Sequence, residues 1–227
     1  MHTIKNWSEN IIFTPKEIHT VENETEIIKL IQTAYSTKRK LRTMGSAHSF
    51  VPLMHSNDLF VRTEKLQGII SVDKIKKRVR VHAGTKLCDL GQLLFNHGLA
   101  QENLGDIDVQ SIGGATATGT HGTGMSFGSL STQISALTLI NGKGERIECS
   151  EEINPDVFKA AQISLGALGV ITEIELKVQN SYILQLISRK EKIEFILENL
   201  ENFNHNTRNF EFLWFPHTDI VQTKFSN

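Results

Sequence analysis

The sequence predicts a mixed α+β fold, and three observations carry this prediction. Amphipathic helical patterns alternate with short β-rich runs along most of the 227 residues. Hydrophobic residues make up 39% of the chain, enough to build one large core or two small ones, so we do not expect disorder. Sixteen glycines stand against four prolines, and many of these glycines cluster between Gly105 and Gly128.

The first part of the chain reads as strand, helix, strand and loop. An apolar stretch at Ile11 to Phe13 precedes a helix at whose start Asn23 and Glu26 form a capping-box pattern. The run 40–44 predicts a strand that leads into the turn 45–50. Short β-rich runs that together indicate a small mixed sheet follow at 59–62, 68–72 and 78–82.

A second helix, a long loop and a hairpin occupy the middle of the chain. The segment from Lys86 to His97 carries leucines on one face and is followed by a glycine, which predicts a helix. The segment from Leu104 to Gly128 shows neither helical nor strand periodicity, so we expect a long loop with a functional role. The runs 134–140 and 146–149 predict a hairpin across the turn 141–144.

The C-terminal part ends on a second β-α-β pattern. Asn154 and Pro155 predict the start of a helix that reaches about Ser164, and the alternation from Val170 to Val178 predicts a strand. A soft boundary lies near residue 180. The β-α-β pattern after it, which indicates the beginning of a second domain, has runs at 182–188, 190–200 and 210–215.

Charge and cysteine content exclude several functional classes. The 24 Lys and Arg residues nearly cancel the 25 Asp and Glu residues, which leaves no basic surplus for a nucleic-acid backbone. Cys88 and Cys149 form neither a disulfide framework nor the CxxC spacing of a metal site. No apolar run approaches the roughly 20 residues of a membrane span, and the first residues lack the apolar core of a signal peptide. We therefore expect a cytoplasmic protein with no metal, no nucleic-acid partner and no integral membrane segment.

Two small-residue loops remain once the common catalytic signatures are excluded. The chain contains no GxxxxGK[ST], no GxGxxG that opens a helix after a strand, no HExxH and no GxSxG. The two loops are Gly45 to Ser49 and Ser111 to Gly124. A pyrophosphate held without metal or basic side chains needs several backbone N–H groups at close range and hydroxyl donors. Both loops supply these groups, so we interpret them as a ligand-binding pair rather than as tight turns alone.

Two of the nine histidines lie in these loops. His48 follows a predicted strand, where its imidazole is placed to act on a ligand as a nucleophile or a base. The residue spacing alone makes His121 a similar candidate. For both histidines, an ordinary role on the surface or in the core stays open. Asp106 and Asp108 are better interpreted as a turn former and a cap than as an acid–base pair.

Taken together, these motifs resemble the FAD-binding domain of the vanillyl-alcohol-oxidase superfamily. The resemblance rests on Arg42–Phe50, Leu104–Ser111 and Thr118–Gly124. Within the superfamily the chain is most similar to the sugar-1,4-lactone oxidases and alditol oxidases, the group that includes D-arabinono-1,4-lactone oxidase. The phrase Phe210–Asp219 resembles the start of that group's substrate domain.

The resemblance implies an organisation and a cofactor. The expected fold is a PCMH-type FAD-binding domain of two α/β subdomains at 7–180, followed at 181–227 by the beginning of a substrate (cap) domain. FAD is the expected cofactor, bonded through His48 to the 8α carbon of the flavin, with Val170 and Ile171 at the adenine end. The cofactor-binding residues that the resemblance implies are Gly45, Ser46, Ala47, His48, Ser49, Ser111, Gly114, Thr118, Gly119, Thr120, His121, Gly122, Val170 and Ile171. Many relatives carry Gly where Ala47 stands, and a positive φ there would strain alanine by about 1 kcal/mol or more.

The implied activity is oxidation of the CH–OH group of a sugar-1,4-lactone or alditol, with oxygen or another acceptor reoxidising the flavin. The catalytic residues of the group are expected in a C-terminal region with no counterpart in this sequence, so none is assigned here. We expect a fragment, a truncated gene product, or a chain completed by a partner. Two alternatives stay open: a non-catalytic flavin- or nucleotide-binding module, and a UDP-N-acetylenolpyruvoylglucosamine reductase-like flavoenzyme, which would not need the His48 tether.

Overall fold

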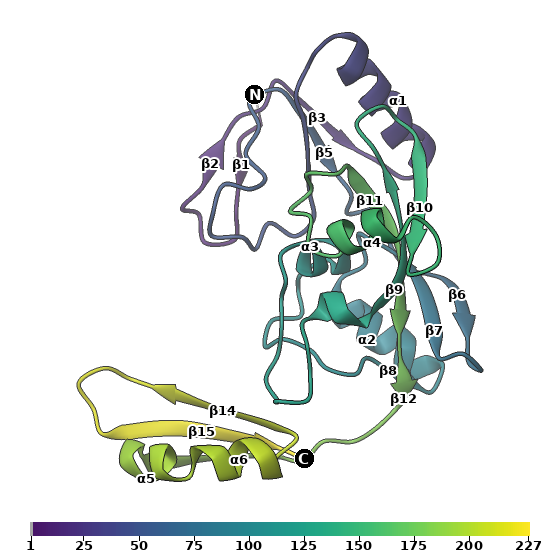
Figure 1. Ribbon diagram of the computed structural model, residues 1–227. Coiled ribbons are helices and arrows are strands. Elements are labelled where there is room, and N and C mark those ends of the chain that lie inside the picture. The colour runs from purple at the N-terminus through teal and green to yellow at the C-terminus, as the bar shows by residue number, and fades with distance from the viewer. Residues whose placement is uncertain (1) are drawn as a thin grey trace.

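The computed structural model describes residues 2–227 and arranges them as two neighbouring α/β subdomains followed by a smaller C-terminal unit (Figure 1). The helices are α1 (Glu24–Ser36), α2 (Leu87–Asn96), α3 (Ile112–Ala117), α4 (Pro155–Ala161), α5 (Ile193–Glu198) and α6 (Leu200–Asn206), with a 3-10 turn at Leu130–Gln133. The strands are β1 (Ile4–Lys5), β2 (Ile12–Phe13), β3 (Glu17–Thr20), β4 (Leu41–Met44), β5 (Leu59–Arg62), β6 (Ile69–Asp73), β7 (Arg78–His82), β8 (Leu99–Ala100), β9 (Ile134–Ile140), β10 (Arg146–Ser150), β11 (Val170–Lys177), β12 (Gln179–Asn180), β13 (Leu186–Lys192), β14 (Asn209–Trp214) and β15 (Ile220–Ser226).

The first subdomain is a parallel sheet of order β3-β5-β4 with α1 packed against it. The predicted capping box is confirmed: Asn23 Oδ1 accepts the Glu26 amide at 3.1 Å, and Glu26 Oε2 accepts the Glu22 amide at 2.9 Å. The helix buries Ile27 and Ile31 against the sheet, which fixes its orientation. The hairpin of β1 and β2 flanks this subdomain on the side away from α1 (Figure 1).

The second subdomain is an antiparallel five-stranded sheet of order β10-β9-β11-β7-β6. Its apolar face, which includes Val79 and Val81, forms one core with the leucines of α2 and with Ile112 of α3. The predicted helix at 86–97 and the predicted hairpin of β9 and β10 are both confirmed. Period-2 alternation predicted β7 and β11, because one face of these strands packs in the core and the other does not.

Three expectations about local structure were wrong. The predicted small mixed sheet does not exist, because β5 pairs within the parallel sheet whereas β6 and β7 join the antiparallel one. The region 104–128 is not all loop, because α3 forms inside it around the buried Ile112, Ala115 and Thr116. Helices this short depend on tertiary packing, which periodicity does not record. The helix after Pro155 ends at Ala161, about one turn before Ser164.

The C-terminal elements are shifted along the chain relative to the prediction. The first strand begins at Leu186 rather than at Tyr182, because Leu186 is the first residue to pair with β15. The predicted helix at 190–200 begins at Ile193 and continues as α5 and α6 to Asn206. The sheet has the order β13-β15-β14 and is covered by the two helices on one face, around the buried Ile196 and Val221.

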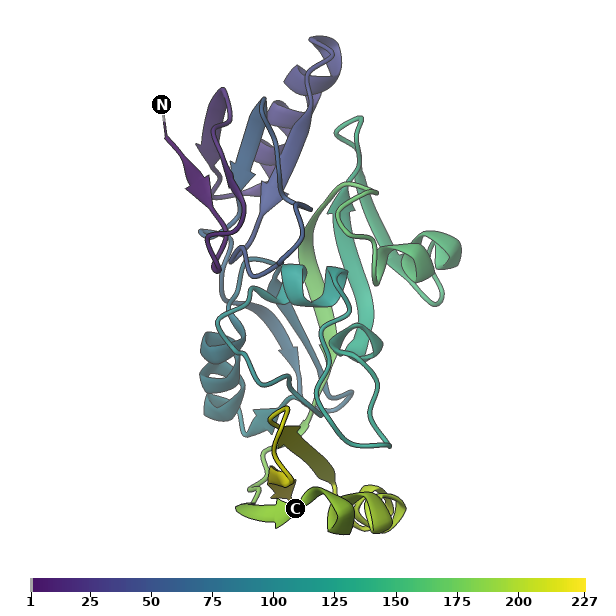
Figure 2. The ribbon, with the colours of Figure 1, turned by 90° about the vertical axis from the view of Figure 1, so that its left-hand side faces the viewer.

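The C-terminal unit lies at the end of the molecule opposite α1 and is joined by the segment 181–185 (Figure 2). Arg208 anchors it to the rest of the chain: its Nη2 donates to the Glu102 carbonyl at 2.5 Å, and its guanidinium lies between the rings of Phe127 and Tyr182. Asn209 Nδ2 donates to the Thr123 carbonyl at 2.6 Å. The C-terminal unit therefore contacts the segment between α2 and β9.

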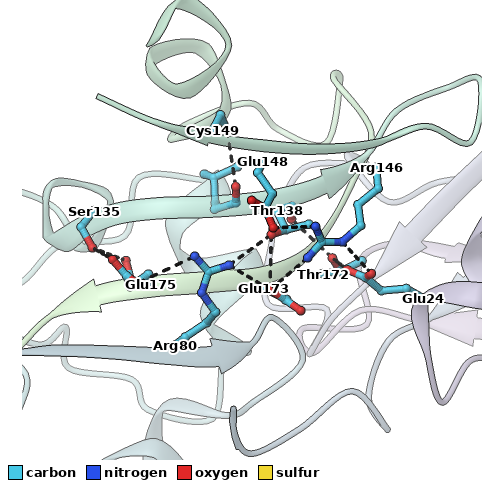
Figure 3. Close-up of polar contacts among 11 residues, drawn as sticks. Glu24, Arg80, Ser135, Thr138, Arg146, Glu148, Cys149, Thr172, Glu173 and Glu175 are labelled. Carbon is cyan, nitrogen blue, oxygen red and sulfur yellow. Dashed lines mark hydrogen bonds and ion pairs between the residues drawn. The ribbon is translucent and has the colours of Figure 1, made fainter. Parts of the chain in front are cut away.

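A polar network joins the two subdomains (Figure 3). Its residues alternate along the strands with Val79, Val81 and Ile174 of the core, so the network lies on the face of the five-stranded sheet away from α2. Arg146 Nε on β10 lies 3.0 Å from Glu24 Oε2 at the start of α1. Glu24 also accepts a hydrogen bond from the hydroxyl of Thr172 on β11. On the same face Arg80 Nη1 donates to Glu173 Oε2 at 3.0 Å. These contacts hold α1 against β10 and β11 from outside.

Residues 2–227 contain neither a membrane-spanning helix nor a cluster of side chains that suits a metal ion. No helix there combines the length and the apolar character that crossing a membrane requires. No three His, Cys, Asp or Glu side chains of that part gather in a way that suits a metal ion.

Candidate functional site

A cavity of about 1110 Å³ lies between the two subdomains. Small-molecule pockets span about 300–1,000 Å³, so this volume suits a ligand the size of a dinucleotide. Three segments supply most of its wall: the loop after β4, the start of α3, and the loop that enters β11. The predicted residues that the structure brings together in this wall are Gly45, Ser46, Ala47, His48, Ser49, Ser111, Gly114, Thr118, Val170 and Ile171.

The loop from Gly45 to Ser49 presents a row of free hydrogen-bond donors. None of its five backbone N–H groups donates to another described residue. Ala47 has φ of +56°, so the strain anticipated for alanine at this position is present. A Cβ added to Gly45 would lie 1.9 Å from Ser111 Oγ, because the two loops touch at this point. The loop is thus shaped to offer amides to an anion, not to satisfy them internally.

The second predicted loop contributes only its first part to the cavity. Ser111 contacts the first loop, since a Cβ at Gly45 would lie 1.9 Å from Ser111 Oγ. Gly114 lines the cavity beside it, where a Cβ would lie 3.1 Å from the same oxygen. The Thr118 amide and hydroxyl are both committed to the Gly114 carbonyl, at 3.2 and 3.0 Å. The Ile112 and Gly113 amides also have partners, the Thr85 and Ala83 carbonyls, both at 2.8 Å. The Ser111 hydroxyl and the Gly114 amide donate to no described residue and are the donors that this segment can offer a ligand.

The structure places four predicted residues outside the cavity wall: Gly119, Thr120, His121 and Gly122. The Gly119 and Thr120 amides donate to the carbonyls of Thr116 and Ala115. His121 is exposed, with Nδ1 3.0 Å from the Gly122 carbonyl oxygen. Their role in ligand binding stays a prediction, and in this conformation the first two have no free amide to offer.

The far end of the cavity lies beside Val170 and Ile171 at the start of β11. The loop before them contains Leu165 at φ +51° and Gly169 at φ +141°. A Cβ on Gly169 would lie 2.2 Å from the Ile140 carbonyl oxygen, so glycine is required where this loop crosses β9. Sequence reasoning identified the two strand residues but missed the loop, although two glycines three positions apart signalled an unusual backbone.

His48 lies where two hollows meet. It lines the large cavity and also a smaller one of about 330 Å³, together with Gly45, Ser46 and Ala47. The imidazole stacks on the indole of Trp7, with ring centroids 5.4 Å apart and planes inclined by 22°. Burial lowers the pKa of His48, because no neighbouring charge compensates for the lost solvation of the imidazolium. The neutral ring, which carries a nucleophilic nitrogen, is therefore favoured near pH 7.

The large cavity also contains polar groups that the sequence did not suggest. The Gln110 side-chain oxygen is buried and has no hydrogen-bond partner among the described residues, although Gln110 lines the wall. Arg39 and Arg42 lie in the outer wall, and Arg39 is paired with Asp58 and Glu17. An orphaned acceptor, free amides and a nearby cation fit FAD, which offers hydroxyl and amino donors as well as two phosphates.

Two family models match this chain. A model described as FAD binding domain matches residues 15–150, which include the first loop and the start of α3. A second model, described as D-arabinono-1,4-lactone oxidase, matches residues 174–227 and so covers the end of β11 and the C-terminal unit.

Full-length relatives are similar over nearly the whole chain. L-gulonolactone oxidase of Mus musculus is 35% identical over 96% of this chain and 49% of the relative. L-gulono-1,4-lactone dehydrogenase of Mycobacterium tuberculosis is 36% identical over 96% of this chain and 50% of the relative. D-arabinono-1,4-lactone oxidase of Eremothecium gossypii is 30% identical over 95% and 41%. The chain spans about half the length of the curated relatives it matches.

Solved structures share the fold at low sequence identity. Cholesterol oxidase from Brevibacterium sterolicum superimposes with a TM-score of 0.88 at 20% identity, over 99% of this chain and 47% of that one. Alkyldihydroxyacetonephosphate synthase gives a TM-score of 0.82 at 16% identity, over 93% and 48%. At such identities the likeness concerns the fold alone.

Proposed function

This chain belongs to the FAD-binding domain family, and we propose that it holds FAD in the cavity between its subdomains and forms the cofactor-binding part of an oxidoreductase. The proposed substrate class is the CH–OH group of a sugar-1,4-lactone or a related alditol. The relatives that support this class are named as gulonolactone and arabinonolactone oxidases and as a lactone dehydrogenase. Oxygen or another acceptor would take up the electrons.

The observation that carries the proposal is the row of unpaired amides from Gly45 to Ser49. A folded protein rarely leaves such a row without partners, and a diphosphate provides acceptors for it without needing a basic side chain in the loop. Ser111 and Gly114 close the cradle from the facing segment. The start of β11, at Val170 and Ile171, would receive the adenine end.

We further propose that His48 tethers the flavin covalently. A nitrogen of its imidazole would bond to the 8α carbon while the imidazole N–H and one methyl C–H are lost. The two electrons and two protons so released would pass to the ring system of the flavin, and dioxygen would take them up as hydrogen peroxide. The lowered pKa of His48 supports this role, because the neutral imidazole has a free electron pair.

The chemistry that a bound flavin would supply is the uptake of a hydride equivalent from a carbinol carbon. The residues of this chain bind the diphosphate, fix the orientation of the ring through His48 and exclude water from the cradle. We assign no catalytic base within residues 2–227. In domain terms we propose a cofactor domain at 7–180 and the beginning of a substrate domain at 181–227.

The test begins with acid-denatured protein. After incubation of the apo-protein with FAD, the wild-type pellet should retain the yellow flavin absorbance, whereas His48→Ala should release it. His205→Ala on α6 is the matched control, because His205 is exposed and far from the cavity wall. A wild-type protein that takes up no FAD at all would overturn the cofactor assignment.

Substrate class is tested separately by anaerobic reduction of the loaded protein. Bleaching of the flavin by L-gulono-1,4-lactone or D-arabinono-1,4-lactone supports the oxidoreductase proposal. Flavin that is bound but is reduced by no lactone and no alditol would instead favour the non-catalytic module. If acid releases all of the bound flavin, only the proposed covalent bond to His48 is contradicted, and the cofactor assignment stands.

A further inference from the structure

The turn between β1 and β2 lies directly against the segment that carries His48. Its main chain donates from the Trp7 amide to the Ala47 carbonyl at 2.9 Å. Its side chains add two more bonds, from Asn6 Nδ2 to the Ser49 carbonyl at 3.0 Å and from Asn10 Nδ2 to the Phe50 carbonyl at 3.1 Å. Residues about 40 positions apart in the chain are thus joined at three points in succession.

These three bonds use only the carbonyl groups of the His48 segment. The amides of Gly45 to Ser49 donate to no described residue, and all five residues line the cavity. Because Ala47 is held at φ +56°, the segment needs external contacts to persist in this conformation. The turn Asn6–Asn10, which we term the N-terminal splint, supplies them.

Asn6 holds the splint itself in shape. It is only 3% exposed, and its Oδ1 accepts the Ile11 amide at 3.0 Å while its Nδ2 donates to Asn10 Oδ1 at 2.7 Å. The apolar residues around the turn, such as Ile4 and Ile11, pack into one cluster with Ala47 at its edge. The splint is therefore a built part of the fold and not a loose terminus.

Trp7 completes the contact by covering one face of the imidazole. Its indole stacks on His48 and meets the Phe50 ring edge-on, with centroids 6.0 Å apart. Trp7 is itself 62% exposed, so it adds little to a hydrophobic core. An exposed tryptophan that is stacked on a cavity-lining histidine has a clearer use in orienting that ring.

We propose that the N-terminal splint is a positioning element for His48, and that Trp7 stacks on the imidazole to hold a ring nitrogen toward the flavin during covalent attachment. This inference rests on the proposed tether through His48. Trp7 is a positioning residue and not a catalytic one, because it acts through His48. The ligand concerned is FAD, and the step concerned is the formation of the bond to the 8α carbon.

The experiment compares Trp7→Ala, Trp7→Phe and the matched control Trp214→Ala in the whole chain. Trp214 is a similarly exposed tryptophan on β14, away from the cavity wall. Apo-protein is mixed with FAD, and acid-stable flavin is measured over time together with the reversible affinity for FAD. We expect Trp7→Ala to slow attachment about tenfold with affinity nearly unchanged, and Trp7→Phe to restore most of the rate.

A second measurement needs no flavin. In the apo-protein the indole should shift the His48 imidazole protons upfield in NMR spectra, and this shift should vanish in Trp7→Ala but persist in Trp214→Ala. Asn10→Ala removes the bond to the Phe50 carbonyl and the bonds that Asn10 Oδ1 accepts from Asn6 and Ser8, but it leaves the indole in the sequence. This variant should slow attachment less than Trp7→Ala does.

The outcomes separate the two proposals. Covalent flavin that forms at the wild-type rate in Trp7→Ala, with the ring shift lost, would overturn the splint and leave the tether standing. Wild-type protein that binds FAD but releases all of it in acid would overturn the tether and the splint with it. Covalent attachment that is slower in Trp7→Ala and is restored in Trp7→Phe supports both proposals.

Discussion

Gly45 is the residue at which an added methyl group would disturb the contact between the first loop and Ser111. A Cβ there would lie 1.9 Å from Ser111 Oγ and 3.1 Å from Ser111 Cβ, so the Ser111 side chain must turn or the first loop must shift. We expect Gly45→Ala to weaken FAD binding about tenfold, because either change moves hydrogen-bond donors of the cradle relative to the diphosphate. Titration of the apo-protein with FAD, followed by flavin fluorescence, measures the effect.

Gly142→Ala is the control for this prediction. Gly142 also lines the cavity, but a Cβ at this position meets no atom within 4 Å. Its FAD affinity should stay within about twofold of wild type, a change of under 0.5 kcal/mol. Equal losses in the two variants would show that the contact with Ser111 does not matter.

Ala47 gives a prediction of the opposite sign. Its φ of +56° is unfavourable for alanine and available to glycine without steric cost. We expect Ala47→Gly to raise the free energy of unfolding by up to about 1 kcal/mol, because relief of strain exceeds the greater chain entropy of glycine. Urea unfolding of the apo-protein measures this, and a lower midpoint would contradict it.

At the scale of elements, Arg39 ties together the edges of the parallel sheet. It donates to Asp58 just before β5 and to Glu17 on β3, at 2.7 and 2.6 Å. The hydrogen bond from Arg39 lowers the pKa of Asp58, so the folded state binds fewer protons than the unfolded state. The pair therefore stabilises the fold above the ordinary pKa of an aspartate, about 3.9, and loses this effect as the pH falls through the lowered value.

Asp58→Asn tests this pH dependence. The variant should be less stable than wild type at pH 7, and the difference should shrink as the pH falls below about 4. Asp219→Asn is the control, since the Asp219 side chain forms no ion pair within residues 2–227. Urea unfolding midpoints across this range provide the measurement, and a difference that is constant with pH would contradict the assignment to the ion pair.

At the scale of the whole molecule, Arg208 holds the C-terminal unit against the rest of the chain. Arg208 lies 4.4 Å from the Phe127 ring centroid and 4.9 Å from that of Tyr182, so its guanidinium is held between the two parts. We expect Arg208→Ala to leave the cofactor domain folded but to speed proteolysis in the segment 181–185 about tenfold. Limited proteolysis followed by mass spectrometry locates and times the cleavage.

Arg189→Ala is the matched variant for this prediction. Arg189 also lies over an aromatic ring, that of Phe225, but both residues belong to the C-terminal unit. Its cleavage rate in the segment 181–185 should stay near that of wild type. If both variants are cleaved equally fast, the result would be explained by lower stability of the C-terminal unit itself, and not by loss of its contact with the rest of the chain.

Much of the fold was predictable because its signals are local. The capping box at Asn23, the leucine face of α2 and the alternation of β11 each involve residues within about two turns or one strand. Strand partners were not predictable, because β5, β6 and β7 are short β-rich runs that follow one another along the chain and yet join different sheets. Helix α3 was missed because burial holds it together, in a stretch whose composition favours turns.

The amino-acid sequence by itself determined that the chain carries two loops rich in small residues, with His48 in the first, and approximately where most helices and strands lie. These features follow from chemistry within a few residues. Only the tertiary structure decided that the Gly45–Ser49 amides are free, that His121 lies outside the cavity wall, and that Trp7 stacks on His48. Each of these depends on contacts between distant segments, and side-chain pattern along one segment does not encode its partner.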